Sequence, residues 1–532
     1  MSDRRTGAIT ALCLAAWSLG ACQTVAPAPA RQQADLVLAG GKVYDGTLAD
    51  AQTADVVVSG GRIVEVGHHA ARLYEAKQRI DVAGLVVAPG FIDPHTHADE
   101  ELGSDDATDR ANLPWAFQGV TTVVVGNDGF GTPHIAGLAA TASERGIGTN
   151  VAYLAGFGPI REAVLGTKNR APDEAELATM RKLTRKAMCE GAWGLSAGLY
   201  YVPQNYAATA EVVEMAKVAG AMGGYYDTHM RDESTYNITV TGAVSETLEI
   251  GREASIPVHI SHIKALGPDV WGQSGPMIAM IEDARQNGQR VTADQYPWSA
   301  SGTRISNALV PHWALEGGLD ALRGRLAHPA EGKRVRDGMV EGLARRGGAD
   351  KLLVTGVLGG VEVPVGQTLA QIADAMRLSP VEAAIAILMQ GDARVASFNM
   401  SDQDIAAFAH RDWVVTGSDG SSGHPRKYAS FPKAYRDLVV DGTMPLVRFI
   451  RRSSAQTAEI VGLTDRGYLK PGYAADIVVF DPATYAPRAS YQEPEELSAG
   501  VRYLFVNGEA LISEGENTGV LSGRPLLKET SC

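Results

Sequence analysis

The sequence of 532 residues predicts an α/β protein: a (β/α)8 TIM barrel with a small β-rich domain built from both ends of the chain. Through the middle of the chain, short apolar strands punctuated by glycine alternate eight times with helical patterns. Both ends are instead rich in short Val/Ile/Leu strands with Gly-Gly and Asp-Gly turns. Residues 300–412 separate the seventh barrel strand from the eighth and are predicted to be an insertion.

Composition narrows the classes of function. Apolar residues make up 45% and charged residues 20%, which allows a large core and excludes a disordered chain. The formal charge of −13, without a long basic run, argues against nucleic acid as a partner. The four cysteines lie far apart with no CxxC pair, so neither a disulfide scaffold nor a thiolate zinc site is expected.

The first 22 residues are predicted to be a signal peptide. Arg4 and Arg5 precede an apolar stretch that is far shorter than the roughly 20 residues of a membrane-spanning helix. Leu-Gly-Ala before Cys22 resembles a bacterial lipobox, in which the cysteine is acylated; an ordinary secretory signal is the alternative. Gln23 then favours the periplasmic face of the outer membrane for an exported lipoprotein. Residues 23–34 are rich in Pro, Ala and Gln and are predicted to be a tether, with the lipid as the only membrane contact.

The β-rich ends are predicted to form one domain from residues 35–90 and 465–532. DLVLAGGKVYDG and DVVVSGGRIVEVG near the start resemble ADIVVFDP and YLFVNGEAL near the end in their strand and turn composition. Residues 91–464 then form the barrel with its insertion. Its strands are expected within residues 85–97, 119–128, 150–158, 193–203, 225–234, 257–267, 290–298 and 413–420.

Side chains that bind metals gather at the carboxyl ends of these strands, where a barrel places its active site. His95 and His97 are two residues apart, and since a strand has a period of two, both rings project from one face. The fifth and sixth strands repeat this spacing, with His229 before Arg231 and His262 before Lys264. Imidazole and carboxylate groups from separate strands suit zinc or another divalent ion. The predicted ligands are His95, His97, Asp128, His229, His262 and Asp419.

Structural alternatives apply to single members of this set. A lone histidine is more often a hydrogen-bonded structural residue than a ligand, and Asp128 could be a turn carboxylate that bonds its own loop. His259 has the opposite parity to His262 on the predicted strand and is expected to face the surrounding helices. The complete constellation nevertheless predicts metal binding.

Several motifs together resemble the D-aminoacylase (N-acyl-D-amino-acid deacylase) branch of the amidohydrolase superfamily. They include PGFIDPHTHAD, GVTTVVVGNDG, THMRDES, ISHIK, DQYPW, GSDG and HPRKYASFPKAY, and they run in order from about residue 35 to the end of the chain. The resemblance implies a distorted (β/α)8 barrel with a β-sandwich formed from both termini. It also implies one or two zinc ions, although another divalent metal is possible.

The resemblance assigns roles to the strand-end residues. His95 and His97 form one part of the metal site. His229 and His262 form the part that binds metal more tightly, and Asp419 is the catalytic carboxylate. Family members typically carry a cysteine where this chain has Asp128. Aspartate can also bridge metals, but it is a harder ligand and leaves metal identity less certain.

Substrate contacts follow from the same resemblance. The equivalents of Lys264, Tyr296 and Arg426 surround the substrate α-carboxylate. Arg231 either contacts substrate or pairs with an acid such as Asp232 or Glu233. Tyr200 and Tyr201 line the pocket or pack in the core.

The predicted activity is metal-dependent hydrolysis of the amide bond of N-acyl-D-amino acids, with Asp419 as proton shuttle. A metallo-dipeptidase or amidase acting on D- or isoaspartyl peptides is the alternative within hydrolases. A lipoprotein that binds N-acyl amino acids without catalysis is the alternative outside them. The predicted partner is therefore a small molecule, and the sequence predicts no oligomeric state.

Overall fold

The structure is a computed structural model that describes residues 31–532. The predicted signal peptide, with Cys22, and residues 23–30 of the predicted tether lie outside the described residues. The first strand, β1, begins at Gln32, so the last residues assigned to the tether belong to the folded domain. No helix of the described chain combines the length and apolar character needed to cross a bilayer.

Both ends of the chain build one nine-stranded sheet, as the sequence predicts. Its middle strand β5 pairs in parallel with β1 and antiparallel with β17, which joins the two ends of the chain directly. Apolar side chains from both ends share one core, among them Val56, Val87 and Phe505. The strands are β1 (Gln32–Val43), β2 (Gln52–Ser59), β3 (Arg62–Gly67), β4 (Tyr74–Asp81), β5 (Val86–Pro89), β17 (Ile477–Phe480), β18 (Val501–Val506), β19 (Glu509–Ser513) and β20 (Glu516–Asn517).

The chain crosses from this sheet into the barrel at Gly90. The predicted strand 85–97 is divided there: β5 belongs to the terminal sheet and β6 (Phe91–Asp93) to the barrel. A Cβ atom at Gly90 would lie 2.2 Å from Oγ1 of Thr121 on the next barrel strand. Only glycine allows this close approach of the two strands.

The remaining barrel strands also form where they are predicted, and all pair in parallel. A parallel bridge between Thr96 and Gly420 brings the first and last strands together just beyond their ends. The strands are β6, β7 (Val120–Val125), β8 (Asn150–Gly156), β9 (Gly194–Gly198), β10 (Tyr225–His229), β11 (Val258–Ile260), β12 (Val291–Gln295) and β16 (Val414–Thr416).

Helices cover the outside of the barrel. α6 (Glu174–Cys189) begins with a capping box between Asp173 and Glu176 and buries Met180, Ala187 and Met188 against the barrel core. The other principal covering helices are α4 (Ile135–Arg145), α5 (Phe157–Leu165), α7 (Thr209–Ala221), α8 (Val240–Glu253), α9 (Ser274–Gln286), α15 (Asp402–Ala409), α16 (Arg426–Tyr435), α17 (Leu446–Ser453) and α18 (Ala455–Val461).

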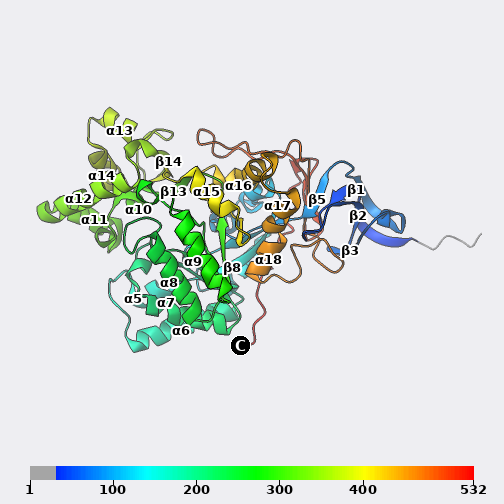
Figure 1. Cartoon of the computed structure of the whole chain (residues 1–532), viewed down its shortest axis with the longest axis horizontal. Coiled ribbons are helices and arrows are strands. Elements are labelled where there is room, and N and C mark those ends of the chain that lie inside the picture. The colour runs from blue at the N-terminus through cyan, green and yellow to red at the C-terminus, as the bar shows by residue number, and fades with distance from the viewer. Residues whose placement is uncertain (1–30) are drawn as a thin grey trace, which may run out of the picture.

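The insertion forms a lobe with its own core. Strand β15 (Asp392–Phe398) lies between β13 (Ala300–Arg304) and β14 (Leu352–Leu358) in an antiparallel sheet, with α10 (Ile305–Leu309), α11 (Gly318–Ala327), α12 (Pro329–Arg345), α13 (Leu369–Met376) and α14 (Pro380–Gln390) beside it. Figure 1 shows this lobe and the terminal sheet at opposite ends of the barrel. The lobe ends with β15, since the following α15 packs on the barrel helix α9. The predicted range 300–412 therefore includes one barrel helix.

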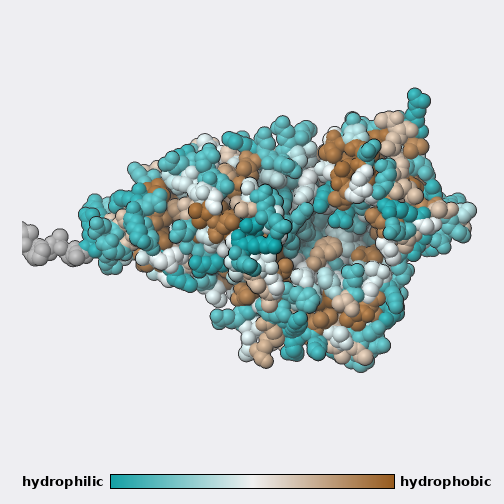
Figure 2. Space-filling model, turned by 180° about the vertical axis from the view of Figure 1, so that it is seen from behind, coloured by the Kyte–Doolittle hydropathy of each residue, from teal (hydrophilic) through white to brown (hydrophobic). Residues whose placement is uncertain are grey.

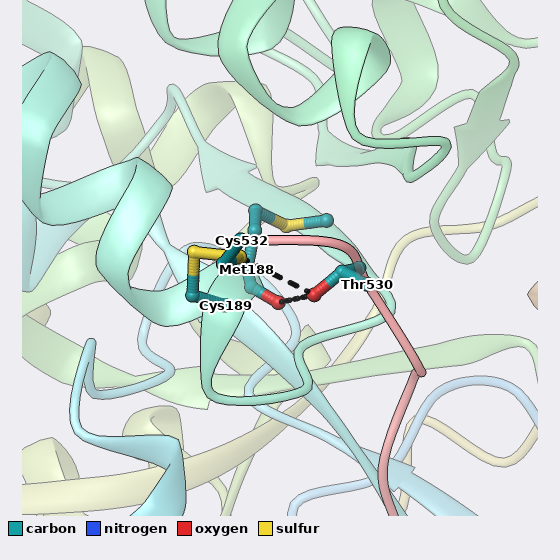
Figure 3. The surroundings of a disulfide bond; sticks show 4 residues. All are labelled: Met188, Cys189, Thr530 and Cys532. Atoms are coloured by element: carbon teal, nitrogen blue, oxygen red, sulfur yellow. Dashed lines mark hydrogen bonds between the residues drawn. A yellow bond between two sulfur atoms is a disulfide. The ribbon is translucent and has the colours of Figure 1, made fainter.

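A disulfide joins Cys189 at the end of α6 to Cys532 (Figure 3). The segment before Cys532 forms the short strand β21 (Pro525–Leu526), which pairs with β8, and Lys528 donates its backbone N–H to the Gly191 carbonyl. The positions of the cysteines in the sequence gave no sign of this pair, which closes a separation of 343 residues.

Candidate metal centre and active site

Four predicted ligands form the first half of the site. His95 and His97 follow β6, Asp128 follows β7 and Asp419 follows β16. Their ligand atoms all lie within 4.8 Å of one another. His97 Nε2 lies 3.2 Å from Asp419 Oδ1 and 3.5 Å from Asp128 Oδ2, and His95 Nε2 lies 3.5 Å from Asp128 Oδ1. This spacing allows one ion to contact all four side chains.

The second half of the site contains His229, His262 and again Asp128. His262 Nε2 lies 3.3 Å and His229 Nδ1 3.8 Å from Asp128 Oδ1. The two imidazoles approach each other with their nitrogens 2.8 Å apart. Asp128 is thus common to both halves, which is the position of a bridging ligand between two ions.

The backbone turns sharply at three of these residues. Asp128, His262 and Asp419 have φ values of 55°, 37° and 47°, a left-handed region that side chains other than glycine rarely adopt. Strained conformations of this kind are typical of functional sites held by their surroundings. At Asp128 the carbonyl accepts a hydrogen bond from Gln204, and it comes so close to Gly198 that a Cβ there would lie 2.1 Å away.

Unpartnered atoms in the cluster match a cation. Both ring nitrogens of His95 and Oδ1 of Asp128 are buried without a hydrogen-bond partner. Buried polar atoms are almost always paired, so these atoms lack a group that this donor set would hold. Imidazole nitrogen and carboxylate oxygen without a thiolate fit zinc and other borderline divalent ions.

The electrostatics of the cluster also favour a positive charge at its centre. Burial alone would raise the pKa of the Asp128 carboxyl, but His95 and His262 beside it hold that pKa well below its usual range. Burial lowers the pKa of His229 to about 4, so this imidazole is neutral near pH 7, which is the form that binds a metal.

Asp419 is oriented by a second contact. Its Oδ1 faces the histidines, while its Oδ2 lies 2.7 Å from the Arg426 guanidinium. Burial opposes ionisation of this carboxyl, but Arg426 together with the neighbouring histidines outweighs burial and lowers the pKa of Asp419. One oxygen is therefore directed at the metal ligands and the other is fixed by a buried cation.

Two buried aspartates that the sequence analysis did not select, Asp93 and Asp294, hold the ligands in position. Asp93 accepts hydrogen bonds from the backbone N–H groups of His95 and Ser418, which ties the two ends of the site together. Asp294 lies 3.7 Å from His95 Nδ1 and 3.1 Å from His259 Nε2. Asp294 stands two residues before Tyr296 in the DQYPW motif, so its parity could have identified it.

The prediction that His259 faces the helices is wrong. His259 is buried and pairs in register with Asp227 and Thr292, and its side chain reaches Asp294 and Thr292 inside the barrel. The parity argument fails because β11 ends at Ile260 and the chain turns at His262, which breaks the alternation between the two histidines.

The metal ligands open into a cavity of about 500 Å³ lined by the barrel strand ends and the insertion. Figure 2 shows the surface hollowed where the lobe meets the barrel. Lys264, Tyr296 and Arg426 line this cavity together, with Lys264 Nζ 5.8 Å and the Arg426 guanidinium 4.8 Å from the centre of the Tyr296 ring. Lys264 also donates to Glu233 at 2.7 Å, and Nε of Arg426 is buried without a partner.

Tyr200 and Tyr201 both line the cavity. The Tyr201 ring lies 4.7 Å from that of His229, and the Tyr200 hydroxyl donates to the Asn307 carbonyl of the insertion at 2.6 Å. Tyr200 therefore connects the barrel to the lobe at the cavity wall.

Arg231 does not line the cavity, so the structure does not support a substrate contact. Its guanidinium forms a buried ion pair with Glu246 of α8 at 2.8 Å and donates to the carbonyls of Asn205 and Ala207. Arg231 therefore has the alternative role, an ion pair with a nearby acid. Its partner is Glu246, however, and neither Asp232 nor Glu233.

Known proteins are similar to this chain in sequence. Residues 327–512 match the Amidohydrolase family. The D-aminoacylase of Alcaligenes xylosoxydans xylosoxydans is 34% identical over 529 residues, which cover 93% of this chain and 98% of that protein. The chain belongs to the D-aminoacylase branch of the amidohydrolase family.

Solved structures of D-aminoacylase relatives share the fold. A D-aminoacylase with a binuclear metal center is similar with a TM-score of 0.78 and 32% identity, covering 93% of this chain and 100% of that one. The N-acyl-D-glutamate deacylase of Bordetella bronchiseptica, solved with zinc and a phosphonate mimic of the tetrahedral intermediate, gives 0.79 and 29% with the same coverage. The predicted fold class, metal-dependent amidohydrolase chemistry and zinc are confirmed by this membership and the His/Asp site.

Three arginines of the cavity wall were missed by the sequence analysis: Arg304, Arg346 and Arg394. All three come from the insertion. No motif marks them, because their position depends on how the lobe folds back over the barrel.

Proposed function

We propose that this amidohydrolase cleaves the amide bond of N-acyl-D-amino acids and releases a carboxylate and a free D-amino acid. The observation that carries the proposal is the convergence of four histidines and two aspartates at strand ends, with Asp419 fixed by Arg426 at the cavity floor. A bound zinc ion would supply an activated water and a Lewis acid for the carbonyl oxygen.

Asp419 is proposed to move the proton. Hydrolysis adds a water oxygen to the acyl carbon, breaks the C–N bond and requires a proton on the departing nitrogen. Asp419 Oδ1 faces the metal ligands, so it can take the proton from the attacking water and then deliver it to the amine. Because Arg426 holds the other oxygen, the carboxylate stays in one orientation for both transfers.

Lys264, Tyr296 and Arg426 are proposed to hold the substrate α-carboxylate. Two cations and a phenol meet at one point of the cavity wall, next to Asp419. The unpartnered Nε of Arg426 leaves a donor for a planar carboxylate. A substrate held there by its α-carboxylate presents its amide toward the metal ligands.

A hydrolysis screen tests this function. N-acetyl-D-amino acids, their L-enantiomers and short D- or isoaspartyl peptides would be compared with zinc-loaded and metal-stripped protein. We expect zinc-dependent release of free D-amino acids. Preferential cleavage of the peptides would support the dipeptidase alternative, and binding without turnover by zinc-loaded protein would support the non-catalytic one.

We further propose that the protein is exported as a lipoprotein to the periplasmic face of the outer membrane, acylated at Cys22. The lipobox-like sequence before Cys22 supports this location. The Cys189–Cys532 disulfide supports export independently, since disulfides persist outside the reducing cytosol. Metabolic labelling with a palmitate analogue and membrane fractionation of wild type and Cys22→Ser test it; equal labelling of both proteins would contradict it.

A further inference from the structure

The insertion gives the cavity a wall without negative charge. Its side chains at the cavity include the arginines Arg304, Arg346 and Arg394 and no acidic residue. Within residues 31–532, none of these guanidinium groups lies within ion-pair distance of a carboxylate. We name these three residues the arginine wall. Arg304 is exposed, Arg394 is half-buried and Arg346 is buried. Three cations without an ion-pair partner beside a substrate site form a favourable place for an anionic group of a ligand.

Two members of the wall, Arg304 and Arg394, lie side by side on neighbouring strands of one sheet. Arg304 on β13 and Arg394 on β15 are direct partners in the antiparallel register. Like charges in this position are destabilising. Burial and the nearby Arg304 lower the pKa of Arg394, as expected for two neighbouring guanidinium groups. The fold therefore keeps an unfavourable pair at the cavity, which a bound anion would relieve.

The pair points along the cavity from the place assigned to the α-carboxylate. A Cβ atom on Gly302 would lie 3.0 Å from the Arg426 guanidinium, so this position faces Arg426. Arg304 is two residues further on the same face of β13, about 6–7 Å along the strand. Arg394 lies beside it on the neighbouring strand. A group attached to the Cα of a substrate held by Arg426 can extend toward this pair.

Arg346 extends the wall into the interior. It is 3% exposed, and its Nε has no hydrogen-bond partner. The guanidinium lies 5.9 Å from the Tyr236 ring, which also lines the cavity. Burial opposes the charge of Arg346, while Tyr236, Tyr200 and the more distant Glu233 favour it and raise its pKa. Arg346 therefore stays a cation although no carboxylate of the described chain lies within ion-pair distance.

The acids of the barrel side do not neutralise the wall. Glu233 is paired with Lys264, Asp419 with Arg426, and Asp128 with the histidines. Glu100 lines the same cavity and is close enough to act on Arg394 electrostatically, but it forms no ion pair with it. Asp99 lines the cavity as well and likewise forms no ion pair with the wall, so no arginine of the wall has a carboxylate partner within the described chain.

We propose that the arginine wall binds a second carboxylate of the substrate, so that the preferred substrates are N-acyl-D-amino acids with two anionic groups. This inference rests on the proposed function. The second carboxylate could come from an acidic side chain or from an acidic acyl group. The direction from Arg426 to Arg304 and Arg394 favours the acidic side chain.

Matched substrates test the wall on the zinc-loaded enzyme. N-acetyl-D-glutamate and N-acetyl-D-glutamine are nearly isosteric and differ in one charge at the side chain. N-succinyl-D-leucine carries a carboxylate on its longer acyl group, which N-acetyl-D-leucine lacks. We expect a kcat/KM for the D-glutamate derivative about 10-fold or more above that of the D-glutamine derivative. A preference for succinyl over acetyl, without a glutamate preference, would place the second carboxylate on the acyl group.

Variants connect this preference to the wall. Arg304→Gln and Arg394→Gln should each reduce the glutamate-to-glutamine ratio about 10-fold or more, mainly through KM, and Arg394→Lys should retain part of it. Arg502→Gln on β18, which removes the same charge far from the cavity, should leave the ratio unchanged. The inference is overturned if wild type shows no preference for either dianionic substrate, or if neither glutamine variant changes the preference.

A binding measurement separates this inference from the proposed function. Calorimetric titration with D-glutamate and D-glutamine reports on the wall without turnover, and thermal unfolding confirms that each variant is folded. If no N-acyl-D-amino acid is hydrolysed but D-glutamate binds 10-fold more tightly than D-glutamine in an Arg394-dependent way, the proposed activity fails and the anion site stands. If N-acetyl-D-glutamine and N-acetyl-D-leucine are hydrolysed with the same kcat/KM as N-acetyl-D-glutamate, the proposed activity stands and only the anion site fails.

Discussion

The barrel side and the insertion side of the cavity differ in whether their charged side chains have ion-pair partners. On the barrel side the buried cations of the cavity wall pair with carboxylates, Arg426 with Asp419 and Lys264 with Glu233. On the insertion side Arg304 stands opposite Arg394 without an acid. The barrel therefore fixes a set of groups in one geometry, which chemistry requires. The insertion leaves its charges available, which suits recognition of different substrates.

The largest effect is expected from Asp419→Asn, which removes the proton shuttle and retains the shape of the side chain. Turnover should fall by about two orders of magnitude or more, while zinc content and thermal stability stay close to wild type. Steady-state kinetics with elemental analysis measures this. Asp437→Asn, on the surface beside Lys433, is the matched control. Turnover near that of wild type would mean that Asp419 is not the shuttle.

The second effect concerns Asp128, which is shared by both halves of the site. Asp128→Ala should lower zinc per chain and activity together, and excess zinc should restore part of the activity. If Asp128 is a turn residue instead, stability falls while the zinc stoichiometry stays complete. Asp128→Cys, which introduces the residue typical of the family, should recover zinc binding, favour softer ions and become sensitive to thiol reagents, to which the wild-type site should be resistant.

The third effect is on recognition of the α-carboxylate. Replacing this group of the substrate by an amide should cost about 1.5–3 kcal/mol in kcat/KM, the range of a charged hydrogen bond. Lys264→Met should lose most of the discrimination between acid and amide, whereas Lys433→Met on the surface should keep it. An undiminished preference for the acid in Lys264→Met would exclude Lys264 from this contact and leave it the role of holding Glu233 and His262 in place.

The smallest effect tests how firmly the insertion is attached. His312 of the lobe packs its ring 4.7 Å from Tyr200, and burial lowers its pKa to about 4. The unfolded chain takes up a proton below about pH 6.5 and the folded chain only near pH 4, so stability should be complete above pH 6.5 and fall between these values. In urea unfolding between pH 7.5 and 4.5 we expect wild type to lose about 2 kcal/mol more stability than His312→Phe, because the variant lacks this one titrating group. The same pH dependence in both proteins would rule out this role.

The sequence was sufficient for what depends on local pattern. The alternation of apolar strands and helices predicts the barrel. The two-residue spacing of His95 and His97 predicts two rings directed to one place, and both lie near Asp128, although β6 ends at Asp93 before either histidine. Parity failed for His259, since a strand that ends early and a left-handed turn at His262 cannot be seen in the alternation itself. Contacts between distant segments were not predictable either: the Glu246 partner of Arg231 and the arginine wall depend on how the chain folds back on itself.

The disulfide between Cys189 and Cys532 gives the chain a property that its fold alone lacks. Every residue of the insertion lies between these two cysteines in the sequence. A protease that cuts one bond in the lobe would therefore leave two fragments joined covalently through sulfur, and a non-reducing gel would still show one species. In a compartment rich in proteases, damage to the part of the protein that selects substrates need not release the part that carries the metal site.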